Sequence, residues 1–178
     1  MSLNTRLLES IDVVVGTAPA DLNSAATVDW VSLKNYDGCL VLLVKAAGTA
    51  GDDPSIILVQ ATDVAGTGSK ALNCIRRLYY KIGTQTGVNT WSSIAITTAT
   101  GDIDTVSVNG TTDLAGDSVQ AMFLVDVRAS DLDVDNGFDC ISYTWDDADL
   151  GNTGLGTILF IPYGARYPGA TPLTAITD

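Results

Sequence analysis

Three aspartates in the segment SDLDVDNGFD have the spacing of ligands in a calcium-binding loop. Asp131, Asp133 and Asp135 stand at positions 1, 3 and 5, where an EF-hand loop supplies oxygen ligands. The glycine falls at position 7 instead of 6, however, and position 12 is Ser142 instead of a bidentate glutamate. The pattern leaves two interpretations open, a weak surface Ca²⁺ site and a solvated acidic turn, and it favours the turn.

A glycine-rich stretch at residues 66–70, GTGSK, contains the residue types of a phosphate-binding loop. A P-loop needs G-x-x-x-x-G-K-[ST] between a strand and a helix, because the helix N-terminus supplies free N–H groups and a favourable dipole. Here the order is Gly-Ser-Lys, and the following segment ALNCIRRLYYKIG has the β-branched and aromatic residues of a strand. The sequence therefore predicts a turn after a strand at residues 55–61, and no nucleotide site.

The residue types needed for catalysis do not come together. The chain has no histidine, which removes Ser-His-Asp and Cys-His catalysis and most zinc sites. Cys39, Cys74 and Cys140 lie beside apolar neighbours, so we expect buried free thiols. Two aspartates could in principle act as acid and base, but aspartates in turns and at strand ends are ordinarily structural. We expect a protein that is not an enzyme and that uses no cofactor.

Arginine and tyrosine, which are enriched at protein interfaces, are concentrated in the segment IRRLYY. Because side chains alternate along a strand, one of each adjacent pair must point away from the core face. Part of this segment therefore faces solvent or a partner. The predicted interface residues, including two in the C-terminal tail, are Arg76, Arg77, Tyr79, Tyr80, Arg166 and Tyr167.

The elements that would position these residues are short strands. Residues 119–127 show the pattern clearly, because every second side chain from Val119 to Val127 is apolar. About nine such strands with polar turns between them predict an all-β fold, an antiparallel β-sandwich or a barrel-like domain. The predicted strands are residues 29–33, 39–46, 55–61, 71–82, 93–97, 103–108, 118–128, 138–145 and 155–163.

The two ends of the chain lack this pattern. Residues 1–28 are predicted to form an extended N-terminal arm, in which apolar residues at helical spacing favour a short helix over residues 2–11. Residues 29–163 make up one β domain. Residues 164–178 contain two prolines and little periodicity, and we expect a tail that runs along a surface of this chain or of a neighbour.

The chain is strongly acidic, with 21 acidic residues, only one of them a glutamate, against nine basic residues and a net charge of −12. Phosphate binding needs clustered lysines and arginines, so this balance argues against nucleic acid as a partner, and it also disfavours an anionic membrane surface. The N-terminus lacks the apolar core of a signal peptide, and the longest apolar run, residues 39–44, is too short to span a membrane. We expect a soluble protein that folds in a reducing cytosol.

Three blocks of the sequence resemble proteins encoded beside the major capsid gene in tailed bacteriophages. They are VDWVSLKNYDGCLVLLVKAAGTAGDDPSIILVQATDVAGTGSKALN, DLDVDNGFDCIS and RYPGATPLTAIT, and the resemblance extends from about Val28 to the C-terminus. The chain is similar to the capsid cement, or decoration, proteins of that group. The resemblance implies a compact β domain that binds the outer face of the assembled head, often as a homo-oligomer.

The resemblance implies that the partner is the major capsid protein and that the function is to bridge capsid subunits and stabilise the shell. The protein would be made in the cytoplasm of a bacterial host and would end up on the virion. Two alternatives stay open. One is a phage tail-tube or head–tail joining subunit, and the other is a Ca²⁺-dependent carbohydrate-binding module that uses tryptophan or tyrosine.

Overall fold

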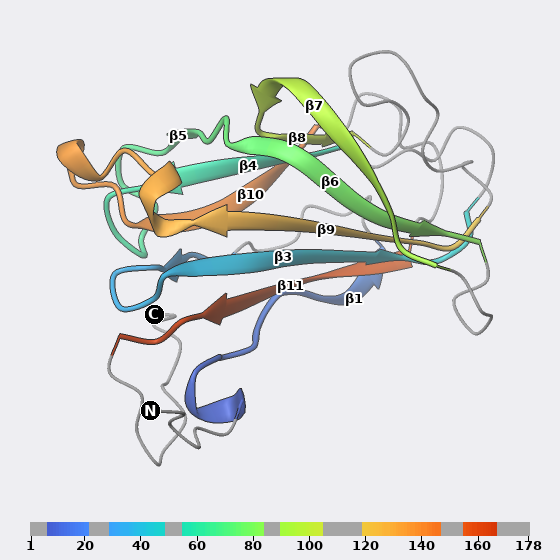
Figure 1. Cartoon of the computed structure of the whole chain (residues 1–178), viewed down its shortest axis with the longest axis horizontal. Coiled ribbons are helices and arrows are strands. Elements are labelled where there is room, and N and C mark those ends of the chain that lie inside the picture. Colours follow the sequence, from blue (N-terminus) through green and yellow to red (C-terminus); the bar gives the residue numbers. More distant parts are fainter. Residues whose placement is uncertain are drawn as a thin grey trace.

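The computed structural model describes residues 7–21, 29–48, 55–83, 90–104, 119–146 and 155–166, which form an all-β fold (Figure 1). Two antiparallel sheets enclose one apolar core, the sandwich-like architecture that the strand pattern predicts. No helix in these ranges is long and apolar enough to cross a bilayer. The elements are η1 (Leu7–Glu9), β1 (Val14–Asp21), β2 (Val31–Ser32), β3 (Gly38–Lys45), β4 (Ser55–Ala61), β5 (Lys70–Ala71), β6 (Ile75–Ile82), β7 (Ser92–Thr100), β8 (Asp102–Asp104), β9 (Ala121–Arg128), η2 (Ala129–Asp131), η3 (Val134–Asn136), β10 (Cys140–Asp146) and β11 (Leu155–Tyr163), where η marks a 3-10 turn.

The larger sheet has six strands in the order β1-β11-β3-β9-β6-β7, which follow one another from bottom to top in Figure 1. The smaller sheet has the order β2-β10-β4-β5, and β8 also pairs with β4. At the centre of the larger sheet, β3 pairs along its whole length with β9 on one side and with β11 on the other. This register decides which side chains of all three strands point into the core, because side chains alternate between the two faces of a sheet.

The core lies between the two sheets. On β3 the inward side chains Cys39, Val41 and Leu43 are at most 1% exposed. Burial of an aliphatic or aromatic side chain contributes about 1.5–3 kcal/mol, so this shared face accounts for much of the stability of the sandwich. The residues that pack with them from both sheets include Phe123, Val125 and Phe160 of the larger sheet and Ile56, Leu58, Ile141 and Tyr143 of the smaller one.

The N-terminal region differs from the sequence prediction of an arm over residues 1–28. Residues 14–21 form β1, which belongs to the larger sheet. The helix predicted over residues 2–11 is reduced in its described part to the 3-10 turn η1, after which Ile11 bridges to Tyr163. The β-branched residues that follow the turn disfavour a helix and suit a strand. Residues 1–6 and 22–28 lie outside the described parts of the chain.

β1 is an irregular edge strand paired with β11. Its register shifts twice, between Val15 and Thr17 and again before Ala20, in a stretch that includes Pro19, and an edge strand tolerates such a residue. Gly16 allows the close approach, since a Cβ at this position would lie 2.6 Å from the ring of Phe160. The strand therefore depends on a contact between residues far apart in the sequence.

The strand predicted over residues 71–82 is two strands in different sheets. β5 pairs with β4 in the smaller sheet, whereas β6 pairs with β7 and β9 in the larger one. Between them, Leu72 is buried and its N–H donates to the carbonyl of Leu58 at 2.9 Å. The chain crosses from one sheet to the other at residues 72–74, and this crossing leads directly into the arginines of β6.

The predicted C-terminal tail begins directly after β11. The backbone N–H of Arg166 donates to the carbonyl of Asn35 at 2.9 Å, which attaches the start of the tail to the turn before β3. Residues 167–178, including Tyr167, lie outside the described residues.

Candidate functional site

The outward face of the larger sheet carries an apolar row that crosses five neighbouring strands. The strand register places Val15 opposite Leu159, Leu159 opposite Leu42, and Leu42 opposite Leu124, which in turn lies opposite Tyr79. Val15 is 48% and Tyr79 40% exposed, and the three leucines between them are half-buried. The outer face of an antiparallel sheet in contact with water is ordinarily polar, so this apolar row has the composition of a surface that becomes covered.

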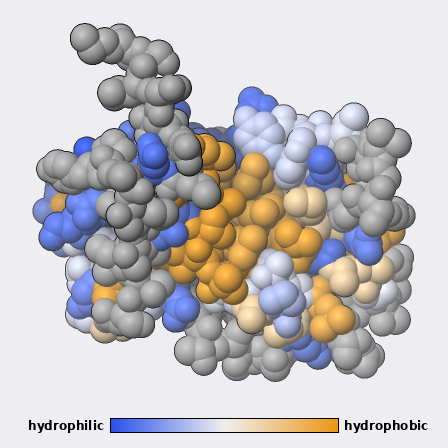
Figure 2. Space-filling model, turned by 90° about the horizontal axis from the view of Figure 1, so that it is seen from below, coloured by the Kyte–Doolittle hydropathy of each residue, from blue (hydrophilic) through white to orange (hydrophobic). Residues whose placement is uncertain are grey.

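Figure 2 shows a continuous hydrophobic patch at the centre of the molecule as seen from below, the side on which β1, β11 and β3 lie in Figure 1. On each side of the apolar row, the next outward-facing row of cross-strand neighbours includes a charged residue on β9 or β6. Leu40 of β3 lies opposite Asp126, and Met122 of β9 lies opposite Lys81. The apolar surface therefore ends at a polar border along β9 and β6.

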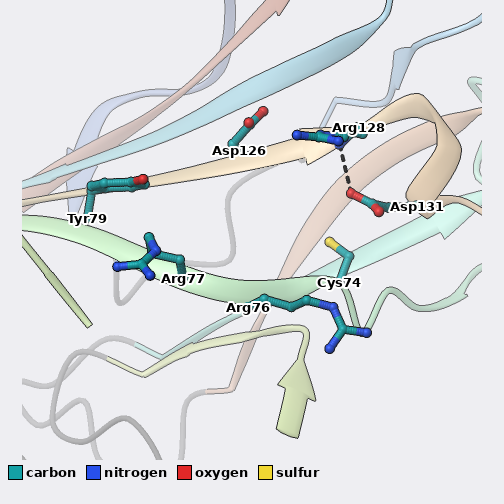
Figure 3. A pocket seen from close by; sticks show the side chains of 7 residues that line it. All are labelled: Cys74, Arg76, Arg77, Tyr79, Asp126, Arg128 and Asp131. Atoms are coloured by element: carbon teal, nitrogen blue, oxygen red, sulfur yellow. Dashed lines mark hydrogen bonds between the residues drawn. The ribbon is translucent and has the colours of Figure 1, made fainter. Parts of the chain in front are cut away.

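A cavity of about 350 Å³ opens at this border (Figure 3). It lies on the outward side of β6 and β9 and includes Tyr79, the last residue of the apolar row. Three of the five arginines in the chain line it, in a protein with a net charge of −12. We call this site the arginine pocket, and its lining residues are Cys74, Arg76, Arg77, Tyr79, Asp126, Arg128 and Asp131.

An irregularity in β6 places two arginines in the pocket. The register of β6 against β7 shifts between Ile75 and Arg77, as in a β-bulge. As a result Ile75 and Leu78 are both buried, and Arg76 and Arg77 between them are both exposed. In the view of Figure 3 their guanidinium groups point to opposite ends of the pocket, Arg77 toward Tyr79 and Arg76 away from it.

The acidic residues of the pocket already accept hydrogen bonds from neutral donors. The hydroxyl of Tyr163 donates to Asp126 at 2.7 Å, and the backbone N–H of Arg128 donates to Asp131 at 2.9 Å, the bond drawn in Figure 3. Arg77 donates through Nη1 to the hydroxyl of Ser93 at 3.0 Å. Over the described parts of the chain the one ion pair joins Lys70 to Asp133, so none of the three pocket arginines is ion-paired there.

The thiol of Cys74, which also lines the pocket, is not activated. Burial raises its pKa to about 12, and the nearby charge of Asp131 adds to the shift. Burial and a hydrogen bond to Asp139 likewise raise the pKa of Cys140 to about 12. The three cysteines are free, as predicted, with Cys39 and Cys140 buried and Cys74 half-buried. A thiol with such a pKa is protonated at neutral pH and is a poor nucleophile or metal ligand.

The three aspartates of the calcium-like loop do not share one site. Asp131 accepts a hydrogen bond from the backbone N–H of Arg128. Asp133 is ion-paired with Lys70, and its two carboxylate oxygens accept from Nδ2 of Asn136 at 2.8 and 2.9 Å. Asp135 is exposed. Lys70 thus already supplies a positive charge to Asp133, and among the described residues no group of three or more histidine, cysteine, aspartate or glutamate side chains is placed to hold a metal ion. This is the geometry of an acidic turn.

The glycine-rich loop is a turn between β4 and β5, as predicted. Asp63 accepts the N–H groups of Ala65 and Thr67, both at 3.0 Å, and these bonds lower the pKa of its carboxyl. Gly66 has a φ of +79° and packs against Trp30, whose Nε1 would lie 2.6 Å from a Cβ at this position. The loop leads into strands and not into a helix, so it lacks the free N–H groups of a phosphate site.

The structure brings together three of the predicted interface residues, Arg76, Arg77 and Tyr79. Tyr80 points the other way and packs against the core. Arg166 is exposed at a different cavity of about 440 Å³, which it shares with apolar residues of the turns around η2. The remaining charged residues of the pocket are Asp126, Arg128 and Asp131. The sequence analysis did not select Asp126 or Arg128, and it selected Asp131 only as a candidate calcium ligand. Alternation along residues 119–127 was the available signal for the first two, since it puts them on the outward face.

Comparison of the chain with protein-family models, with curated proteins and with solved structures gave no match.

Proposed function

We propose that this protein is a structural component of a virion, which binds the outer surface of a tailed-phage capsid and stabilises the shell by bridging capsid subunits. The observation that carries the proposal is the apolar row on the outward face of the larger sheet, which ends in the arginine pocket. Contiguous exposed apolar surface marks interaction sites, and tyrosine and arginine dominate the binding energy of many protein interfaces. The surface thus supports a binding function.

The choice of partner rests on the sequence. The blocks that resemble phage cement proteins contain β2 to β5, the turn around η3 with the start of β10, and the segment after β11. The partners that we propose are the major capsid protein and further copies of this chain. On a symmetric shell many contacts of modest strength act together, so a homo-oligomer gains avidity without a large contact area for each copy.

The chemistry of the described residues supports action by binding alone. The thiols have raised pKa values, the sequence has no histidine, and Asp63 and Asp131 accept hydrogen bonds within turns. We therefore propose no catalytic step and no cofactor, and neither nucleic acid nor a membrane as a partner.

The first test is the copy number of the protein relative to the major capsid protein in gradient-purified particles from its source. We expect a ratio near one, or near a simple fraction set by the capsid lattice. A ratio of a few per cent would instead indicate a tail or head–tail joining protein. Absence of the protein from the particles would overturn the proposal.

A further inference from the structure

We propose further that the arginine pocket receives the carboxylate of an aspartate or glutamate side chain on the capsid surface. This inference rests on the proposed function and adds the chemistry by which the partner is recognised. The apolar row would supply contact area, and the pocket would set the position of the protein on the shell.

The local charge of the pocket is opposite to that of the whole molecule. Its three arginines and two aspartates give a formal charge of +1, in a chain whose net charge is −12. An approaching acidic side chain is therefore attracted at short range to this site. Charge complementarity of this kind fixes the orientation of a complex more than it raises its affinity.

The guanidinium groups have donors to spare. Arg77 uses Nη1 on Ser93, which orients the group, and a guanidinium carries five N–H donors. Asp126 and Asp131 accept from Tyr163 and from a backbone N–H, and they make no ion pair with the pocket arginines in the described structure. A guanidinium prefers a carboxylate that it can bind through two parallel hydrogen bonds, which is the geometry an incoming side chain could provide.

The surroundings favour a protein carboxylate over a phosphate. The two aspartates at the rim repel a second negative charge, and the N–H groups of Arg128 and Cys74 are already bonded to Asp131 and Leu72. Many phosphate sites in proteins add free backbone N–H groups to their basic side chains, and in this pocket these two are already bonded. Tyr79 belongs to both the pocket and the apolar row. An aspartate or glutamate of a partner protein could therefore enter the pocket while neighbouring apolar side chains of that partner pack on the row. A nucleic-acid backbone has no such side chains.

The test is binding of the full-length chain to particles stripped of it, measured by co-sedimentation. We expect Arg76→Gln, Arg77→Gln and Arg128→Gln each to weaken binding, with a loss of about tenfold at the arginine that makes the direct pair. The matched control is Lys34→Gln, which makes the same change in charge at an exposed residue outside the pocket and should change the affinity less than twofold. Melting curves check that all variants fold.

For a fourth variant, Asp126→Asn, we expect binding to particles to become stronger instead of weaker. Asp126→Asn keeps an acceptor for the hydroxyl of Tyr163 but removes a charge that competes with the incoming carboxylate. We expect it to tighten binding, whereas a purely structural role for Asp126 would give unchanged or weaker binding, and that result would contradict the inference.

Competitors identify the group that is recognised. At equal ionic strength a hexaglutamate peptide should displace the wild-type protein from particles, and inorganic phosphate or a single-stranded oligonucleotide should not. Displacement by phosphate or the oligonucleotide, but not by the peptide, would overturn the inference that the pocket binds a protein carboxylate. If the wild type binds and all three arginine variants bind equally well, the inference fails and the proposed function stands. If the wild type itself does not bind, the proposed function fails.

Discussion

Lys70 links the smaller sheet to the acidic turn before β10. Its ammonium group is ion-paired with Asp133 and lies 4.0 Å from the centre of the Phe138 ring. The backbone N–H of Asp133 donates to the side chain of Gln60 on β4 at 2.8 Å, so the turn is attached to β4 as well as to β5. Lys70 thereby helps to hold a carboxylate for which the sequence left two interpretations open, a weak Ca²⁺ ligand and part of an acidic turn, and favoured the turn.

We expect Lys70→Met to lower the melting temperature at neutral pH and to reduce the loss of stability in acid. The hydrogen bond and charge of Lys70 hold the pKa of Asp133 below its ordinary value of 3.8. A lowered carboxyl pKa stabilises the folded state above pH 3.8, and this contribution is lost as the pH falls through the lowered pKa. Melting curves between pH 7 and pH 2 measure the difference between wild type and variant.

The two curves should converge at the acid end, because Asp133 is then protonated in both proteins. A difference that stays constant down to pH 2 would show that Lys70 acts through packing on Phe138 and not through its charge. Lys34→Met, at an exposed residue outside this turn, is the control and should follow the wild type across the whole range.

The sequence predicts part of the pocket and misses part of it for identifiable reasons. Alternation correctly separates Tyr79 from Tyr80, since that end of β6 is regular. The same rule does not foresee that Arg76 and Arg77 are both exposed, because the shift in register depends on pairing with β7. Asp131 enters the site through the turn after β9, and no period in the sequence predicts the direction of a turn.

At the scale of elements, neighbouring leucines on β3 separate the two faces of the larger sheet. Leu43 is 1% exposed in the core, whereas Leu42 belongs to the apolar row. We expect Leu43→Ala to lower the free energy of unfolding by about 2–5 kcal/mol, measured by urea denaturation. Leu42→Ala should cost clearly less in stability, because a half-buried side chain leaves a smaller cavity, and should instead weaken binding to stripped particles.

These two substitutions serve as controls for each other, since they change the same residue type on one strand. Equal stability losses would contradict the assignment of an inner and an outer face. Unchanged particle binding by Leu42→Ala would show that the apolar row is not part of the binding surface.

Most strands were predictable because their own residues alternate or form apolar runs, as β9, β11 and β3 do. β1 was not, because its alanines, glycine and proline carry no such pattern and its place depends on the contact between Gly16 and Phe160. The break between β5 and β6 was missed for a related reason. Leu72 is apolar and buried like a strand residue, but it lies at the crossing between two sheets.

The molecule as a whole carries a net charge of −12, so its copies repel one another at long range. If the chain forms a homo-oligomer, as we propose, added salt should strengthen it. The screening length falls from about 30 Å in 0.01 M salt to about 3 Å in 1 M salt, while the hydrophobic contribution of an apolar interface is retained. Sedimentation equilibrium at both salt concentrations should show a larger average mass at the higher one.

An average mass that falls with added salt would show instead that opposite charges hold the copies together. The interface between copies would then consist of ion-pairing groups and not of the apolar row. Circular dichroism at both concentrations controls for any change in folding.

The position of β3 at the centre of the larger sheet also constrains how the chain can fold as it is synthesised. β3 ends at Lys45, yet its neighbours begin at Ala121 and Leu155, so the ribosome releases this apolar strand long before either partner exists. An unpaired apolar strand is prone to aggregation, and such non-local pairing is slow to form. A chain that stopped before Leu155 would lose an interior strand and leave one edge of β3 open. Premature termination near the C-terminus would therefore give the cell a substrate for its chaperones and proteases, and not a shortened but working protein.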